Sequence, residues 1–242
     1  VEEFPKLPIE FYNWFSFKGW QIYDHQLSLI SHFKRGNSCL LIAPTGSGKT
    51  LSGFLPSLIE LSGSKQIKRY STAQLHTLYI SPLKALSIDV HRNLQLPINE
   101  MRLPIRCETR TGDTNQTKRK RKKMLPPDLL LTTPESIELM LAWPNASSYF
   151  SDLSAIIIDE IHTVIGNKRG DLLSLSITTL RKYAPNASFI GLSATVADPF
   201  QLAKWLAPDP KQVAIISPKL NKKIEIDIYH PKTNEMPYAG HS

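Results

Sequence analysis

The chain has 242 residues, a formal net charge of +8 and 41% hydrophobic residues, which is enough apolar material for a buried core. No stretch approaches the roughly 20 consecutive apolar residues of a membrane span, and the first five residues carry no signal-peptide pattern. Cys39 and Cys107 lie far apart, which gives no support to a disulfide framework or a zinc site and indicates a reducing compartment. We therefore expect a cytoplasmic protein without a membrane partner, and the missing initiator Met suggests a piece of a longer chain.

Most of the net charge comes from one run of six basic residues, Lys118 to Lys123. Such a run attracts phosphate polyanions, but it is equally typical of a solvated helix face or a localisation signal. The remainder of the chain is only weakly basic.

Short apolar segments rich in β-branched residues alternate with stretches of helical spacing through most of the chain. The expected strands are residues 38–43, 76–81, 105–108, 128–131, 155–159, 188–192 and 212–216. The expected helices are residues 49–61, 83–101, 134–141, 171–183 and 199–206. Right-handed crossovers between parallel strands give a doubly wound, mostly parallel α/β sheet, whose ligand sites lie beyond the carboxyl ends of the strands.

Residues 43–50, APTGSGKT, follow an apolar strand and open a helix, which is the context of a phosphate-binding loop. Gly46 and Gly48 let the backbone turn so that successive N–H groups point at phosphate, and the helix N-terminus adds its positive dipole end. Lys49 supplies a charge to the β- and γ-phosphate oxygens, and the Thr50 hydroxyl can ligate Mg²⁺. We predict that ATP contacts this loop through Thr45, Gly46, Ser47, Gly48, Lys49 and Thr50.

The apolar run at residues 155–158 ends in two adjacent carboxylates, Asp159 and Glu160. In a parallel sheet these emerge beside the phosphate loop, so Asp159 can hold Mg²⁺ and Glu160 can orient or deprotonate the attacking water. With Lys49 they are the predicted catalytic residues.

His162 is predicted to contact the ATP site and to couple it to Ser193 and Thr195, which follow another apolar strand. The alternatives are a surface helix position for His162 and simple turn formation by the two hydroxyl residues.

The last part of the chain breaks the alternation. One alternating stretch, residues 223–229, is followed by a polar tail with two prolines and a glycine, which predicts a strand leading into a connector. We expect residues 1–36 to form an N-terminal segment with aromatic and nucleotide-binding residues, 37–218 the ATP-binding domain, and 219–242 the start of a connector to a second domain.

Five motifs follow one another in order: APTGSGKT, ISPLKAL at 80–86, TTPES at 132–136, DEIH at 159–162 and SAT at 193–195. This set resembles superfamily 2 helicases of the DExH type, whose phosphate loops commonly begin with alanine, as at Ala43. The segments PLKAL, ETRTGDT, KRGD and GLSAT more narrowly resemble the large helicase-related (Lhr) family, which includes helicases associated with DNA ligase and DNA repair. The resemblance implies a RecA-like P-loop domain and ATP-driven 3′ to 5′ translocation on single-stranded DNA with strand separation.

The position of these motifs at strand ends implies a nucleic-acid track. Turns of this kind bind backbone phosphates through N–H groups, hydroxyls and helix N-termini, without distinguishing bases. The expected contacts are Pro82, Leu83, Lys84, Arg110, Thr111, Gly112, Thr133, Pro134, Glu135, Ser136, Lys168 and Arg169. Lys168 and Arg169 could equally be exposed loop charges, and residues 133–136 also fit an ordinary helix N-terminus. DNA is favoured over RNA, although an RNA helicase of similar build, or a nucleotide-gated binding module without hydrolysis, stays open.

The nucleotide motif of the family has the approximate form GWxPRxHQ, and residues 19–26 keep its glycine, aromatic, histidine and glutamine. The resemblance implies that Gln26 hydrogen-bonds the adenine edge, and Tyr23 or Trp20 is a candidate for stacking on the base. The neighbouring aromatic residues Phe11, Trp14, Phe15 and Phe17, together with Trp20, are expected to serve core or interdomain packing.

Family members carry their arginine fingers on a second RecA-like domain, which is therefore an expected partner. The resemblance also suggests DNA ligase and other repair proteins as partners and a location at the bacterial nucleoid. We expect the 242 residues alone to bind nucleotide weakly, hydrolyse it slowly and fail to unwind.

Overall fold

A single all-parallel sheet of seven strands organises the part of the chain that the computed structural model describes, residues 6–64, 74–82, 84–112 and 125–218. The strands are β1 (Ser38–Ile42), β2 (Thr77–Ile80), β3 (Cys107–Arg110), β4 (Leu129–Thr132), β5 (Ala155–Ile158), β6 (Ser188–Ser193) and β7 (Val213–Ile216). Their order across the sheet is β3-β4-β2-β5-β6-β1-β7, and every neighbouring pair is parallel. The α/β fold predicted from the alternation of apolar runs and helices is confirmed.

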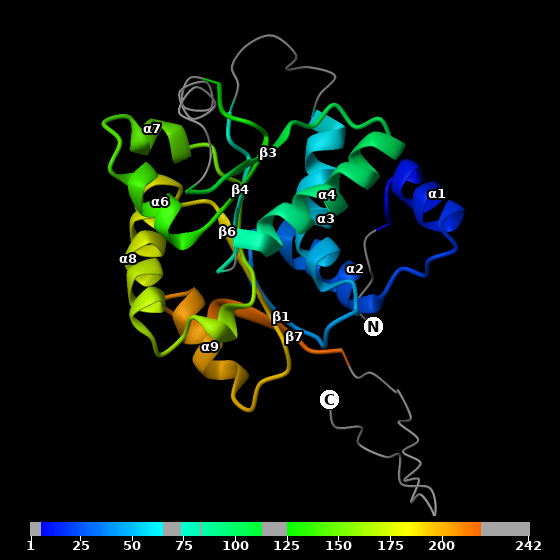
Figure 1. The fold of residues 1–242 in the computed structure, drawn as a ribbon. Coiled ribbons are helices and arrows are strands. Elements are labelled where there is room, and N and C mark those ends of the chain that lie inside the picture. Colours follow the sequence, from blue (N-terminus) through cyan, green and yellow to red (C-terminus); the bar gives the residue numbers. More distant parts are fainter. Residues whose placement is uncertain (1–5, 65–73, 83, 113–124, 219–242) are drawn as a thin grey trace, which may run out of the picture.

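Helices cover both faces of the sheet (Figure 1). On one side lie α1 (Ile9–Phe17), α2 (Asp24–Lys34), α3 (Lys49–Ser64) and α4 (Lys84–Glu100), and on the other α6 (Pro134–Leu141), α7 (Ala146–Phe150), α8 (Lys168–Tyr183) and α9 (Pro199–Leu206). Successive strand residues face opposite layers, so Leu41 and Ile157 pack toward the first group while Leu40 and Ile156 pack toward the second. Burial on both faces explains why the strands are almost continuously apolar.

The N-terminal aromatic cluster divides between core and surface. Phe11, Trp14 and Phe15 are buried in the same core as α2, α3 and α4, which confirms the packing role expected for them. The Nε1 of Trp14 donates to Glu100 Oε2 at 2.6 Å and so ties α1 to the end of α4. Trp20 packs edge-on against Trp14 and keeps about half of its surface exposed.

Strand β3 lies two residues later than the sequence pattern predicts, at Cys107–Arg110 rather than 105–108. Leu103 and Ile105 are buried, but Ile105 N donates to Leu103 O at 2.8 Å in a tight turn before the strand. The apolar residues of this turn gave the hydrophobic pattern of a strand, so the predicted strand start was wrong. Arg110 therefore ends the strand, instead of following it.

Helix α8 begins three residues before the predicted start at residue 171. Asn167 precedes it in extended backbone conformation, and its Oδ1 accepts from Gly170 N at 3.0 Å, which caps the first turn. Lys168 and Arg169 therefore lie in the first turn of a helix. They lie in a helix rather than in the loop that the alternative assumed, and Lys168 is exposed.

All seven carboxyl strand ends meet at one edge of the sheet. The phosphate loop follows β1, the Ser193 segment ends β6 and Asp159 follows β5, whereas the predicted nucleic-acid segments follow β2, β3 and β4 and open α8. Because β5 and β2 are neighbours, Glu160 lies where these two halves of the edge meet.

Several predicted features fall outside the described residues: Leu83, the basic run at 118–123, and the strand and connector at 219–242. Within the described ranges, no helix has both the length and the apolar character that crossing a bilayer requires.

Candidate functional site

The phosphate loop has the backbone of an anion-binding turn. Gly46 and Gly48 adopt φ values of 79° and 73°, in the left-handed region that glycine enters at little cost. The Ser47 hydroxyl donates to Pro44 O at 2.7 Å and closes the turn just before α3 begins at Lys49. Thr45 is exposed at the surface of the loop, and Thr50 is half-buried in the first turn of the helix.

The side chain of Lys49 is buried without satisfying its three donors. Only 6% of it is exposed, and no hydrogen-bond acceptor in the described part of the chain reaches its Nζ. The nearest charge is Glu160 Oε1 at 3.5 Å. A buried ammonium is costly when its N–H donors have no acceptor, even with a carboxylate nearby, so the loop fits the phosphates of a nucleotide.

The predicted nucleotide motif packs directly beneath the phosphate loop. Gln26 is 2% exposed, its Oε1 accepts from Tyr23 N at 3.0 Å, and a Cβ on Gly48 would lie 3.4 Å from its Nε2. His25 is buried as well and hydrogen-bonds the backbone of Ser47; its burial lowers its pKa. The ring of Tyr23 stacks on His25 with 5.2 Å between centroids and leaves about half of its surface free.

Sequence reasoning assigned no role to His25, although it stands in the family's nucleotide motif. It contacts the phosphate loop at the backbone of Ser47, and its ring stacks on one face of Tyr23. Trp20, the other candidate for adenine stacking, packs on Trp14 instead.

Asp159 is buried at the end of β5 and is held by two donors. Its Oδ1 accepts from Glu160 N at 2.9 Å, and its Oδ2 accepts a short hydrogen bond from the Tyr79 hydroxyl. Burial raises the pKa of Asp159, while the bond from Tyr79 acts in the opposite direction. Burial, and the nearby Asp159 carboxylate, also raise the pKa of Tyr79.

Tyr79 is a site residue that sequence reasoning missed. The signal was a tyrosine inside the apolar strand β2, because a buried phenol hydroxyl needs a hydrogen-bond partner. Only the pairing of β2 with β5 shows that this partner is Asp159.

Glu160 has a strained backbone. Its φ and ψ are 45° and 41°, and within the described ranges only Arg102 shares a positive φ among residues other than glycine. This conformation costs about 1–2 kcal/mol for such a residue. It places the carboxylate between Lys49 Nζ and His162, whose Nδ1 lies 3.4 Å from Glu160 Oε2. Strain at the predicted base is typical of a functional position that the surrounding structure enforces.

His162 connects this carboxylate to the end of β6. Its Nδ1 accepts from Ala194 N at 3.3 Å and lies 3.2 Å from the Ser193 hydroxyl. Thr195 is exposed and makes neither of these bonds, so the backbone of Ala194 occupies the place that we predicted for the second hydroxyl. The structure thus brings His162 and Ser193 together and leaves Thr195 apart.

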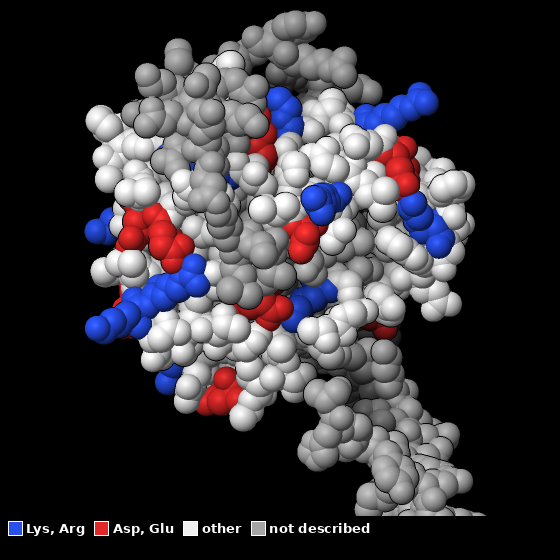
Figure 2. All heavy atoms as spheres, viewed as in Figure 1, with Lys and Arg blue, Asp and Glu red and all other residues white. Residues whose placement is uncertain are grey.

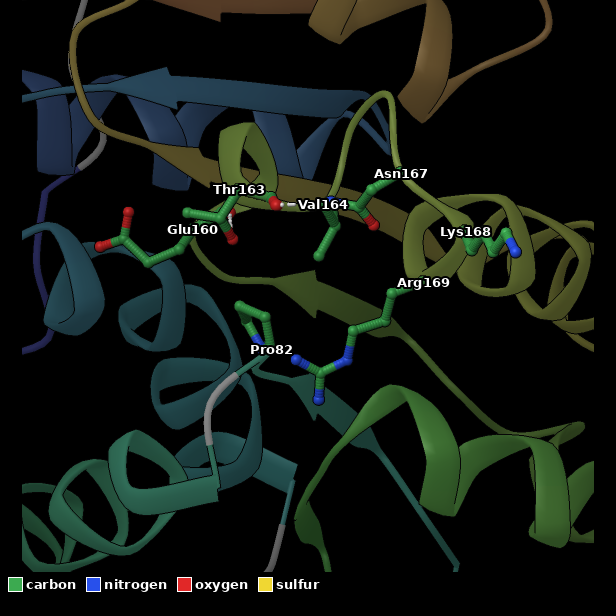
Figure 3. Close-up of a pocket in the computed structure, with 7 residues that line it drawn as sticks. All are labelled: Pro82, Glu160, Thr163, Val164, Asn167, Lys168 and Arg169. Carbon is green, nitrogen blue, oxygen red and sulfur yellow. Dashed lines mark hydrogen bonds between the residues drawn. The ribbon is translucent and has the colours of Figure 1, made fainter.

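Three of the predicted nucleic-acid residues, Pro82, Lys168 and Arg169, line a surface hollow of about 460 Å³, together with Glu160, Thr163, Val164 and Asn167 (Figure 3). Arg169 directs its guanidinium beside Pro82, while Lys168 points away. Arg169 Nε also pairs with Glu135 Oε1 at 2.5 Å, which links α8 to α6. The hollow therefore lies between Glu160 and the first turn of α8.

The other predicted contacts differ in exposure. Thr133, Pro134 and Ser136 are buried at the start of α6, where the Thr133 hydroxyl donates to Ser136 Oγ at 3.3 Å. Arg110 is 7% exposed, and its guanidinium lies 4.5 Å over the ring of Trp143. Thr111 is buried and Gly112 is exposed, while Lys84 is the first residue of α4. On the face shown in Figure 2, basic and acidic side chains are interspersed.

Comparison with known proteins agrees with this arrangement. Residues 23–202 match the model of the DEAD/DEAH box helicase family, which spans the phosphate loop and every carboxyl-edge motif through Ser193. The chain belongs to the DEAD/DEAH box helicase family.

Within this helicase family the chain is similar to Lhr proteins. It is 36% identical to the ATP-dependent helicase Lhr-Core of Methanocaldococcus jannaschii, over 90% of this chain and 27% of that protein. It is 39% identical to the Lhr helicase/uracil glycosylase of Escherichia coli, over 83% of this chain and 14% of that protein.

Among solved structures, Mycobacterium smegmatis helicase Lhr bound to ssDNA and AMP-PNP matches with a TM-score of 0.78 and 36% identity, over 88% of this chain and 28% of that one. The resemblance to the Lhr family is confirmed, and the chain spans about a quarter or less of the length of these relatives.

Proposed function

We propose that this chain is the ATP-binding RecA-like half of an Lhr-type helicase, which uses ATP and Mg²⁺ to move along single-stranded DNA in the 3′ to 5′ direction. The observation that carries the proposal is the buried, unsatisfied ammonium of Lys49 beside the strained carboxylate of Glu160. A buried ammonium with free hydrogen-bond donors, next to a base held in place, is suited to hydrolysing a phosphate anhydride. Support comes from the similar Lhr structure, which is bound to ssDNA and AMP-PNP.

In this proposal Lys49 pairs with the β- and γ-phosphates and leaves Glu160 free to orient and deprotonate the attacking water. His162 accepts from Ala194 N and so is fixed beside the Glu160 carboxylate, where its ring limits the positions that this carboxylate can take. Thr195 makes no bond to His162, and we include it in the proposed coupling segment, residues 193–195, because it directly follows Ala194 in the chain.

Asp159 and the Thr50 hydroxyl are the oxygen donors that would hold Mg²⁺, which when bound neutralises the charge on the phosphates. The described residues contain no group of three or more metal-ligating side chains. Two protein ligands fit Mg²⁺, which keeps several waters and takes phosphate oxygens as further ligands.

The adenine is proposed to lie on the exposed ring of Tyr23, which His25 supports from behind. Gln26 would hydrogen-bond the base through its amide, and its present bond to Tyr23 N exchanges for that contact. The loop residues from Thr45 to Thr50 bind the phosphates.

The nucleic-acid track is proposed to follow Pro82, Leu83 and Lys84, then Gly112, the start of α6 and the first turn of α8. Backbone N–H groups and the charges of Lys168 and Arg169 would contact phosphates there, with Glu135 orienting Arg169. The buried Arg110 would act on this track by holding Thr111 and Gly112 in place. The N-terminal hydroxyl pair of α6, Thr133 and Ser136, with Pro134 between them, completes the track.

A second RecA-like domain with the arginine fingers completes the proposed motor, a proposal that the much greater length of the Lhr relatives supports. We also propose a place in DNA repair at the nucleoid, with DNA ligase among the partners, on the strength of the ETRTGDT and KRG segments. Co-purification of DNA ligase with the complete gene product tests that partner.

The experiment that tests the function compares two variants of the complete gene product. Lys49→Ala should abolish binding of AMP-PNP, whereas Glu160→Gln should keep binding and lower ssDNA-stimulated ATP hydrolysis by about 100-fold or more. The exposed residues Lys182 and Glu10 provide matched controls, because Lys182→Ala and Glu10→Gln should change neither property.

Two outcomes would contradict the proposal. Full ATPase activity in Glu160→Gln would remove the base from the mechanism and favour a nucleotide-gated binding module. Stimulation by RNA that exceeds stimulation by a DNA strand of the same sequence would favour an RNA helicase.

A further inference from the structure

The strained backbone of Glu160 is held by the residue three positions later. The carbonyl oxygen of Glu160 accepts two hydrogen bonds from Thr163, one from the backbone N and one from Oγ1, both at 2.8 Å. On its other side, Glu160 N donates to Asp159 Oδ1. The left-handed conformation of Glu160 therefore depends on the position of Thr163.

Thr163 is held in turn by Asn167. The Nδ2 of Asn167 donates to Thr163 O at 2.9 Å, and the Oδ1 of the same side chain accepts from Gly170 N at 3.0 Å. One amide thus bonds simultaneously to the turn after Glu160 and to the first turn of α8. Asn167 also lines the hollow that separates Glu160 from Arg169 (Figure 3).

The first turn of α8 is packed rigidly against the same turn. A Cβ added to Gly170 would lie 1.8 Å from Val164 O, so the helix backbone touches the carbonyl of the residue after Thr163. Arg169, between Asn167 and this contact, pairs with Glu135 of α6. A displacement of the first turn of α8 is therefore transmitted to Thr163, either through the Val164 contact or through the Asn167 amide.

We propose that Asn167 is a positioning residue that couples phosphate binding at the first turn of α8 to the placement of Glu160. This inference rests on the proposed function, because it presumes that nucleic acid binds at α8 and that Glu160 is the base. A phosphate at the helix N-terminus is attracted by the dipole and by the charges of Lys168 and Arg169, and it competes with Glu135 for Arg169. The resulting shift of the turn reaches the Glu160 carbonyl through Asn167 and Thr163, which gives nucleic acid and ATP hydrolysis a shared structural element.

The chemistry of asparagine allows the coupling role to be separated from helix capping. Asn167→Asp and Asn167→Ser both retain an oxygen that caps Gly170 N, but neither retains the amide donor to Thr163 O. Asn145 provides the matched control, since it precedes α7 and its side chain makes no capping bond. Asn145→Asp introduces the same charge without touching the Glu160 turn.

In the complete gene product, both Asn167 variants should lower the kcat of ATP hydrolysis at saturating ssDNA by about two- to tenfold, the effect of one hydrogen bond. The KM for ATP and the thermal midpoint should stay near the wild-type values, and Asn145→Asp should match wild type. The neutral serine variant separates the loss of the donor from the added charge of aspartate.

Thr163→Val tests the next step of the same chain of bonds. It removes the hydroxyl donor to Glu160 O, and it should lower the stimulated kcat to a similar extent. Thr178 is its control, because the Thr178 hydroxyl is exposed and donates to the backbone O of Ser174 within α8. Combining Thr163→Val with Asn167→Ser should lower kcat by less than the product of the single effects, as expected for residues that act through one element.

The outcomes distinguish this inference from the proposed function. Wild-type protein whose ATPase does not respond to ssDNA contradicts the function itself. A stimulated wild type with Asn167→Asp and Asn167→Ser equally stimulated overturns the coupling role alone. Equal losses of basal and stimulated kcat, accompanied by a lower thermal midpoint, would assign Asn167 a merely structural role and also overturn it.

Discussion

Replacing Gly170 with alanine should destabilise the protein far more than a change of one methyl group suggests. The added Cβ would lie 1.8 Å from Val164 O and 2.7 Å from Val164 C, against an ordinary contact of 3.4 Å or more. Both neighbours are backbone atoms, so no change of side-chain rotamer relieves the overlap. The first turn of α8 must move away by more than an ångström.

The magnitude follows from three contributions. Overpacking costs about 1–3 kcal/mol, and the upper end applies here because the clash is with backbone. Moving the turn also weakens the cap that Asn167 provides to Gly170 N, which costs about 1 kcal/mol. The higher helix propensity of alanine offsets about 1 kcal/mol. The net loss is about 3 kcal/mol, or roughly 6–12 °C in thermal midpoint for a chain of this size.

Urea unfolding followed by circular dichroism measures this loss, with Gly63→Ala as the control. Gly63 lies in α3, and a Cβ there meets nothing within 4 Å, so alanine should stabilise the chain by about 0.5–1 kcal/mol. A Gly170→Ala variant within about 0.5 kcal/mol of wild type would refute the reasoning from the Val164 contact. So would an equal loss in the two variants.

Three further predictions concern the carboxyl edge of the sheet and the proposed nucleic-acid track. Because burial raises the pKa of Asp159, the stability that this group contributes is present below the ordinary carboxyl pKa and is lost as pH rises through the folded value. Asp159→Asn should therefore resist urea better than wild type at neutral pH, with the gap closing toward pH ~4, and a less stable variant at neutral pH would contradict this. Tyr79→Phe removes the hydrogen bond to Asp159 that lowers the pKa of that carboxyl. The variant should therefore lose about 1.5–3 kcal/mol of unfolding free energy and shift the acid limb of the ATPase pH profile to higher pH, whereas the exposed Tyr12→Phe should change neither property. Arg169→Ala should change the unfolding free energy by less than about 1 kcal/mol but reduce the slope of log affinity for ssDNA against log salt by about one phosphate contact. The exposed Arg35→Ala is the control, and an equal slope in the two variants would exclude Arg169 from the track.

The sequence predicted those parts of the site that depend on short segments. The loop from Ala43 to Thr50 carries its glycines, lysine and threonine within eight consecutive residues, so the local backbone already specifies an anion-binding turn. Asp159 and Glu160 follow an apolar run, and the rule that parallel strands end at one edge was enough to bring them to Lys49. The strands of the sheet and its parallel arrangement were predictable for the same reason.

Element boundaries were less predictable where apolar residues served a turn. Leu103 and Ile105 are buried like strand residues, but they precede β3, and the hydrophobic pattern does not distinguish the two cases. The capping role of Asn167 moved the start of α8 to Lys168, and a cap is a hydrogen bond whose geometry the residue type only suggests.

Contacts between distant segments were decided only by the tertiary structure. The Tyr79 hydroxyl meets Asp159 across 80 residues of sequence, because β2 and β5 are neighbours in the sheet. Arg110, predicted as a surface contact, is buried under Trp143. A sequence pattern specifies which face of an element is apolar, but the partner of each polar side chain depends on which elements become neighbours.

The sequence alone determined that a phosphate-loop motif lies at the carboxyl edge of a parallel sheet, since that information lies in contiguous motifs. The left-handed backbone of Glu160, and the bonds from Thr163 and Asn167 that hold it, came only from the folded structure. A strained conformation cannot be inferred from local preferences, because the local preferences oppose it. The packing of α8 on the turn at Val164 enforces the conformation of Glu160 instead.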